Sequence, residues 1–172
     1  MTLRCHVDLT GILFSLLSLI LLPAGCQQAG DPVPLDAAME LQETGHSDQA
    51  IQMLAREDIE KNLQASSLRT LKINENEFKE LPQWKRDFFS EESLLLVPLL
   101  KRAAYLQIEQ LQAAEDAGAA EKAKALQSQL QRLIGFLQNK QRLQLYQQLG
   151  GGIQMKLKEA TSDQVDSSQE ET

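Results

Sequence analysis

Cysteine and histidine, which zinc sites, disulfides and nucleophilic catalysis use, are scarce in this chain. Its thiols and imidazoles are the adjacent pair Cys5-His6 and the separated Cys26 and His46. Zinc binds to clusters of Cys and His, and nucleophilic catalysis places a Ser or Cys beside a base such as His. Glu91-Glu92 could supply paired carboxylates, but adjacent helical residues point about 100° apart and do not converge. The reactive residues therefore predict neither a catalytic nor a metal site.

The first 25 residues have the organisation of a secretory signal peptide. A short head contains Arg4, an apolar run extends from Leu9 to Leu22, and Pro23 and the small pair Ala24-Gly25 follow. A basic head, an apolar middle and small residues before a cut site are typical of such peptides. A membrane-spanning helix needs about 20 apolar residues, and this run is shorter. The sequence therefore favours a cleaved signal peptide over a membrane span.

Removal of residues 1–25 would leave Cys26 and His46 as the remaining thiol and imidazole. An intramolecular disulfide needs two thiols, and a zinc site needs several ligands, so neither is expected. Only His46 could act as a catalytic imidazole base. It could also sense pH, but the sequence favours an exposed turn residue beside Gly45. We therefore expect that the protein is not an enzyme and that it binds neither a cofactor nor a metal.

The stretch Leu22-Pro23-Ala24-Gly25-Cys26 resembles the lipobox of bacterial lipoproteins, in which a small pair precedes a cysteine. The resemblance implies that the Cys26 thiol receives a diacylglyceryl group, that the chain is cut before Cys26, and that the new amine is acylated. It departs from the family at Pro23, where Leu is usual. An Asp directly after the cysteine resembles an inner-membrane retention signal. Gln27 stands at that position here, and the absence of Asp favours the outer membrane. A plain secretory signal with an incidental cysteine is the alternative.

The acidic composition argues against nucleic acid as a partner. The net charge is −7, and it stays at −7 without residues 1–25, because Arg4 and Asp8 cancel. Nucleic acids are bound by clustered Lys and Arg, whereas pairs such as Lys85-Arg86 and Lys101-Arg102 are separated by acids here. We predict a membrane contact through the N-terminal lipid and a protein partner. The expected organisation is a signal peptide at 1–25, a lipidated cysteine and tether at 26–35, a helical domain at 36–160 and a disordered acidic tail at 161–172.

The predicted fold is all-α, a small bundle of repeat-like antiparallel hairpins. A first helix begins near Asp36, ends at Gly45, and is followed by a second from Ser47 or Asp48. The segment Leu41–Leu54 resembles the inter-helix turn of a tetratricopeptide repeat, in which a Gly reverses the chain and a small Ala lets the helices approach. It departs from that family at Ser47, where an aromatic residue is usual, and at Glu57, where a small residue is usual.

The middle of the chain predicts a short helix at 59–65, a loop, and another short helix that begins at Asn74 with Glu77 in a capping box. Pro82 suits the first turn of the next helix. Trp84, Phe88 and Phe89 follow, and we interpret them as core anchors rather than as a ligand pocket.

A long hairpin is expected at about 91–138. Ser90 and the acids after it predict the start of its first helix, in which Leu96, Leu99, Ala103, Leu106, Gln110 and Ala114 form one stripe and Pro98 introduces a kink. After Gly118, the partner helix has a coiled-coil-like seam formed by Ala123, Leu126, Leu130, Leu133 and Leu137. Gly118 and Ala123 repeat the spacing of Gly45 and Ala50, which fits either two related hairpins or coincidence.

The C-terminal part predicts a helix from about Gln141 that ends at the hinge Gly150-Gly151-Gly152, and then a short helix containing Ile153 and Leu157. No strand precedes these glycines and no Gly-Lys-Ser/Thr follows them, so they do not form a phosphate loop.

These features favour a lipid-anchored, non-catalytic helical module that binds another protein or supports an assembly. The alternative is a small-molecule or lipid-binding protein with an apolar pocket. In either case the candidate partner or groove residues are Trp84, Phe88, Phe89, Leu95 and Leu99.

Overall fold

The computed structural model describes the backbone of residues 34–167 and the side chains of residues 34–162. The expected signal peptide, Cys26 and the tether before Pro34 lie outside these residues. Within them the chain forms helices and no strand, which confirms the all-α prediction. The elements are α1 (Pro34–Glu43), α2 (Ser47–Ala55), α3 (Ile59–Ala65), η1 (Arg69–Leu71, a 3₁₀ turn), α4 (Glu75–Glu80), α5 (Gln83–Asp116), α6 (Ala120–Leu137) and α7 (Gln144–Ser167).

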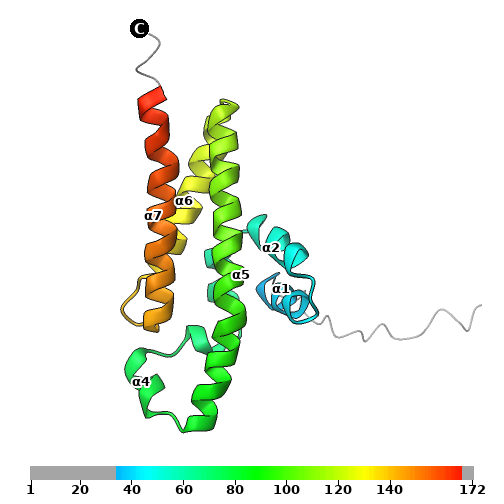
Figure 1. The fold of residues 1–172 in the computed structure, drawn as a ribbon, viewed down its shortest axis with the longest axis vertical. Helices are drawn as coiled ribbons and strands as arrows, with labels where there is room; N and C mark the ends of the chain where they lie inside the picture. Colours follow the sequence, from blue (N-terminus) through cyan, green and yellow to red (C-terminus); the bar gives the residue numbers. More distant parts are fainter. Residues whose placement is uncertain (1–33, 168–172) are drawn as a thin grey trace, which may run out of the picture. The chain divides into compact units, whose positions relative to one another are not determined.

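Helix α5 is the central element, against which α1, α2, η1, α6 and α7 pack (Figure 1). Helices α1 and α2 lie on one side of it, and α6 and α7 lie on the other. Because α5 has neighbours on several sides, its buried residues form a wide face instead of the single stripe expected from the sequence. Leu106 and Gln110 are only partly buried, whereas Gln107 and Leu111 are buried. Helix α5 continues without a break through Pro98.

The first half of α5 differs most from the sequence prediction. The helix begins at Gln83, so Ser90 is an interior residue and not an N-cap. Its hydroxyl donates a hydrogen bond to the Arg86 carbonyl at 2.8 Å. Phe89 is buried as expected, but Trp84 and Phe88 are 68% and 57% exposed, so the prediction that they anchor the core is wrong. They share a helical face four residues apart, and that face points to solvent.

The two hairpin turns are built in the same way. After α1, Gly45 has a φ of 84°, and the His46 N–H donates to the Leu41 carbonyl at 2.8 Å. After α5, Gly118 has a φ of 67°, and the Ala119 N–H donates to the Ala114 carbonyl at 2.8 Å. Both are Schellman C-caps, in which glycine adopts the left-handed conformation at low cost. The turns therefore match in geometry as well as in spacing.

Helix α7 continues through the glycines that were expected to end it. Gly150 is buried where α7 meets the end of α6, and a Cβ there would lie 3.0 Å from the Leu137 Cβ. Gly151 and Gly152 have no such neighbour within 4 Å. The glycine run therefore includes a site of close helix packing, and it is not a hinge. The tetratricopeptide-like hairpin predicted from the sequence lies in α1 and α2, and the coiled-coil-like seam lies in α6.

The seam of α6 is buried as expected: Ala123, Leu130, Leu133 and Leu137 are buried, and Leu126 is partly buried, where α6 packs against both α5 and α7. Helices extend beyond both predicted boundaries of the helical domain, residues 36 and 160. Helix α1 begins at Pro34, two residues before Asp36, and Leu35 is fully buried. Helix α7 runs to Ser167, past Thr161, where a disordered tail was expected to begin.

The short helices that follow α2 agree with the sequence prediction. Helix α3 covers Ile59–Ala65, as expected. The capping box of α4 is present, because the Asn74 side chain accepts from the Glu77 N–H and the Glu77 carboxylate accepts from the Asn74 N–H, both at 3.0 Å. Helix α4 itself has no buried residue.

Candidate functional site

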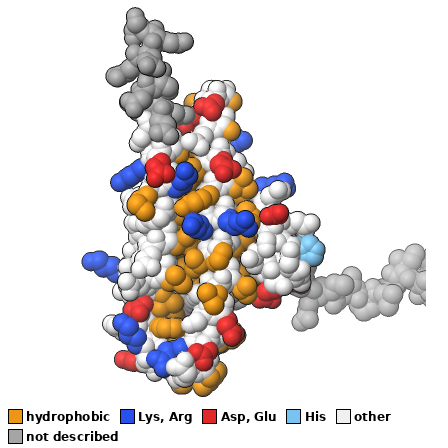
Figure 2. Space-filling view, in the orientation of Figure 1, with side chains coloured by type: hydrophobic (Ala, Val, Ile, Leu, Met, Phe, Trp, Pro, Cys, Tyr) orange, Lys and Arg blue, Asp and Glu red, His pale blue; other side chains and the backbone are white. Residues whose placement is uncertain are grey.

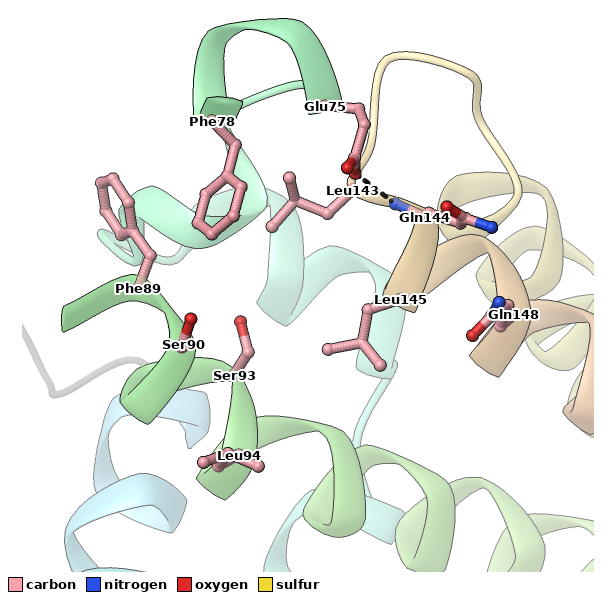
Figure 3. A pocket seen from close by; sticks show the side chains of 10 residues that line it. All are labelled: Glu75, Phe78, Phe89, Ser90, Ser93, Leu94, Leu143, Gln144, Leu145 and Gln148. Atoms are coloured by element: carbon pink, nitrogen blue, oxygen red, sulfur yellow. Dashed lines mark hydrogen bonds between the residues drawn. The ribbon is translucent and has the colours of Figure 1, made fainter. Parts of the chain in front are cut away.

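A pocket of about 440 Å³ lies between α4, the first half of α5 and the start of α7. We call it the α4 pocket. Figure 3 shows Phe78, Phe89 and Leu143 around one space, with Leu145 on its α7 side. The remaining lining residues are mostly polar: Glu75, Ser90, Ser93, Gln144 and Gln148, together with Leu94. Such a mixture of apolar walls and a few polar groups is common in small-molecule sites.

Three buried hydroxyls form a cluster that includes Ser93 of the pocket lining. Thr70 Oγ1 is 2.8 Å from Ser93 Oγ and 3.0 Å from the Tyr146 hydroxyl, and these last two atoms are 3.3 Å apart. The three residues belong to η1, α5 and α7, so the hydroxyl cluster connects three elements. Burial raises the pKa of Tyr146, although its bonds to Ser93 and Thr70 oppose the change. Tyr146 is therefore protonated at neutral pH, and neither hydrogen-bond partner of the Ser93 hydroxyl, Thr70 or Tyr146, is a base that could activate it.

The roof of the α4 pocket is attached to α7 by one polar contact. The Glu75 carboxylate accepts a hydrogen bond from the Gln144 N–H at 3.2 Å (Figure 3). Gln144 is the first residue of α7, where free N–H groups and the helix dipole favour a carboxylate. Phe78 of α4 is partly buried and packs against the hydrophobic core. Glu75 and Phe78 thus hold α4 over the pocket.

A second depression, of about 490 Å³, lies between α1 and α5, and we call it the acidic groove. Its apolar lining is formed by Met39, Leu68, Phe88 and Leu95. Its charged lining consists of carboxylates without a Lys or Arg: Asp36, Glu40 and Glu43 from α1, and Glu91 and Glu92 from α5. The spacing of four and three residues places the α1 acids on one face of that helix.

The carboxylates of the acidic groove are not neutralised by ion pairs in the part of the chain that the structure describes. The acidic members of the ion pairs found there are Asp58, Glu60, Glu75 and Glu159. Glu92 accepts a hydrogen bond from the Thr70 N–H at 3.1 Å. Burial raises the Glu92 pKa, while that hydrogen bond and the positive charge of Arg69 act in the opposite direction.

The residues singled out from the sequence do not meet in one site. Phe88 and Leu95 line the acidic groove, whereas Phe89 lines the α4 pocket. Leu99 is 1% exposed in the core and lines neither depression. Trp84 is exposed, and the Lys85 ammonium lies 5.3 Å from its ring centroid.

Sequence reasoning missed the α1 wall of the acidic groove and the hydroxyl cluster. The α1 wall had a signal, because Asp36, Glu40 and Glu43 recur at helical spacing. His46 is exposed in the α1–α2 turn, as expected, with its Nδ1 3.2 Å from the Thr44 hydroxyl. Figure 2 shows a further band of hydrophobic side chains along α5 and its boundary with α7, with Lys and Arg side chains near the middle.

Among the described residues, no group of three or more His, Cys, Asp and Glu side chains could hold a metal ion. No helix in that same part of the chain has the length and apolar character needed to cross a membrane. Comparison of the chain with protein families, with curated proteins and with solved structures gave no match.

Proposed function

We propose that this chain is a lipid-anchored, non-catalytic interaction module of the bacterial cell envelope, held at a membrane surface by acylated Cys26. The lipobox-like stretch before Cys26 supports the anchor. Each buried methylene of an acyl chain contributes about 0.8 kcal/mol, and two or more chains give stable attachment. Gln27 after the cysteine favours the outer membrane.

The observation that supports a binding role is the exposed apolar surface on the first half of α5. Trp84 and Phe88 are 68% and 57% exposed on one face of the helix, and Phe88 contributes to the acidic groove. Large exposed side chains that gather beside a depression are typical of protein-binding surfaces, whereas scattered ones need no explanation. The partner would therefore contact the α1–α5 side of the bundle.

Site-specific photocrosslinking in cells tests this function. A photoreactive phenylalanine analogue is placed at Trp84 or Phe88, with Met155, which is 65% exposed on α7, as the matched control. We expect a discrete crosslinked species from positions 84 and 88 and none from position 155. Cys26→Ala should move the protein out of the membrane fraction. Recovery of uncrosslinked protein from both test positions would contradict the binding role.

The second candidate function is binding of a small apolar molecule, and the α4 pocket favours it. Its volume of about 440 Å³ falls within the usual range of ligand sites, roughly 300–1,000 Å³. Titration with N-phenyl-1-naphthylamine, a dye that fluoresces in apolar sites, tests this function. Leu145→Arg should abolish saturable binding because Leu145 lines the pocket and is 41% exposed, so the fold tolerates the charge. Trp84→Arg is the control, and equal dye binding by both variants would exclude the pocket.

A further inference from the structure

The acidic groove combines an apolar floor with negative charge on both walls. Asp36, Glu40 and Glu43 stand on the α1 wall, and Glu91 and Glu92 stand on the α5 wall. Glu43 comes seven positions after Asp36, which corresponds to about 10 Å of helix. The same separation relates Phe88 to Leu95 on α5. The groove is therefore about two helical turns long.

This pattern selects among possible occupants. A bound metal ion is not favoured, because no group of acidic side chains in the described region could hold one. A second copy of this chain would bring the same acidic groove and a net charge of −7. Like charges brought together weaken association, so self-association is disfavoured. An anionic lipid surface is disfavoured for the same reason.

The chain's own remaining segments do not provide the missing positive charge. Residues 1–33 contain Arg4 as their only Lys or Arg, together with two Asp residues. Residues 168–172 contain two Glu residues and no basic residue. The complementary charge must therefore come from another molecule.

We propose that the acidic groove binds a cationic amphipathic segment of a partner protein. Apolar side chains of that segment pack against Phe88 and Leu95, and Lys or Arg side chains on both of its flanks face the two acidic walls. A helix with one apolar stripe bordered by basic residues has this arrangement. The inference rests on the proposed binding role and specifies the chemistry of the partner.

A defined peptide tests this chemistry directly. The probe is a fluorescein-labelled helical peptide of about two to four turns with Leu at positions i, i+3, i+4 and i+7 and Lys elsewhere. The intact protein in zwitterionic nanodiscs is titrated by fluorescence anisotropy, with empty nanodiscs as the blank. A peptide of the same composition in scrambled order keeps the charge but loses the apolar stripe. We expect tighter binding of the amphipathic peptide than of the scrambled one.

Two triple variants separate the groove from general acidity. Glu40→Gln, Glu43→Gln and Glu91→Gln remove three of the five groove carboxylates, whereas exposed carboxylates near the distal α5–α6 turn serve as the matched control: Glu109→Gln, Asp116→Asn and Glu121→Gln. The groove variant should bind about tenfold more weakly at low salt, and the control should change less than about twofold. Circular dichroism checks that both variants fold. Equal weakening by the two variants, or equal binding of both peptides, would overturn the inference.

Crosslinking distinguishes failure of this inference from failure of the proposed function. If the species crosslinked from Phe88 disappears in the groove variant and remains in the control variant, the cationic partner is supported. If it persists in the groove variant, the protein binds a partner but not through these charges. If neither Trp84 nor Phe88 gives a crosslink, the inference and the binding role both fail.

Discussion

Alanine substitution in the glycine run of α7 should give opposite results at adjacent positions. Gly in the interior of a helix is less favourable than Ala by roughly 0.5–1 kcal/mol, because it loses more backbone freedom on folding. At Gly151 and Gly152 an added Cβ has no neighbour within 4 Å. Each of these substitutions should therefore stabilise the fold by about that amount.

Gly150→Ala should instead destabilise the fold. Its Cβ would lie 2.9 Å from the Gln138 Cγ, 3.0 Å from the Leu137 Cβ and 3.3 Å from the Gln138 backbone nitrogen. Two of these atoms are fixed by the end of α6, and movement of the Gln138 side chain would disturb its 3.1 Å hydrogen bond to Gln154. Overpacking costs about 1–3 kcal/mol. After the gain in helix propensity is subtracted, the net loss is roughly 1–2 kcal/mol.

Thermal unfolding followed by circular dichroism at 222 nm measures both effects. A change of 1 kcal/mol moves the midpoint of a domain of this size by about 3–4 °C. Gly150→Ala should lower the midpoint, while Gly151→Ala raises it. Gly135→Ala, at an exposed position inside α6 with no neighbour within 4 Å, is the control for propensity alone. If Gly150→Ala raises the midpoint as much as Gly151→Ala does, the close packing of α6 and α7 is wrong.

Three further predictions concern the core and its buried polar groups. Tyr146→Phe should cost about 1–2 kcal/mol in the free energy of unfolding, measured with urea, because it removes one member of the hydroxyl cluster while Thr70 keeps its 2.8 Å partner; a loss above about 4 kcal/mol would contradict this account. Burial raises the Glu92 pKa above its ordinary value near 4.5, so the unfolded chain releases this proton first as the pH rises, and stability should fall across the interval between the two pKa values. Glu92→Gln should remove this pH-dependent loss of stability. Urea unfolding between pH 4 and 7 should then give a free energy of unfolding that depends less on pH than in the wild type, and an unchanged pH dependence would contradict the prediction. Phe89→Ala should cost about 3–5 kcal/mol, whereas Trp84→Ala should stay within roughly 0.5 kcal/mol of the wild type, and similar losses from both would show that Trp84 is buried after all.

Local signals predicted the fold where a few neighbouring residues determine the backbone. The capping box of Asn74 and Glu77 and the glycine turns at Gly45 and Gly118 satisfy hydrogen bonds or a left-handed φ within their own segments. The α6 seam was also predictable, because its stripe at three- and four-residue spacing is the buried face of the helix whichever helices cover it. The caps and turns do not depend on distant parts of the chain.

The remaining errors come from tertiary contacts that override local preference. Ser90 looks like an N-cap, but inside a continuous helix its hydroxyl bonds the carbonyl four residues earlier. Gly150 looks like a helix terminator, but it is the small residue that lets α7 approach α6. The acidic groove depends on which faces of α1 and α5 meet, and neither sequence segment carries that information alone.

Helix α4 has a consequence for the kinetics of any ligand that uses the pocket beneath it. Because Phe78 is the only apolar side chain of α4, swinging this helix outward uncovers little apolar area beyond that ring, so the free-energy difference between shut and open forms should be small. Breaking the Glu75–Gln144 contact and withdrawing Phe78 would be sufficient. A ligand would then enter and leave the α4 pocket faster than the whole protein unfolds. Backbone amides of residues 75–80 should accordingly exchange with deuterium well before those of α5.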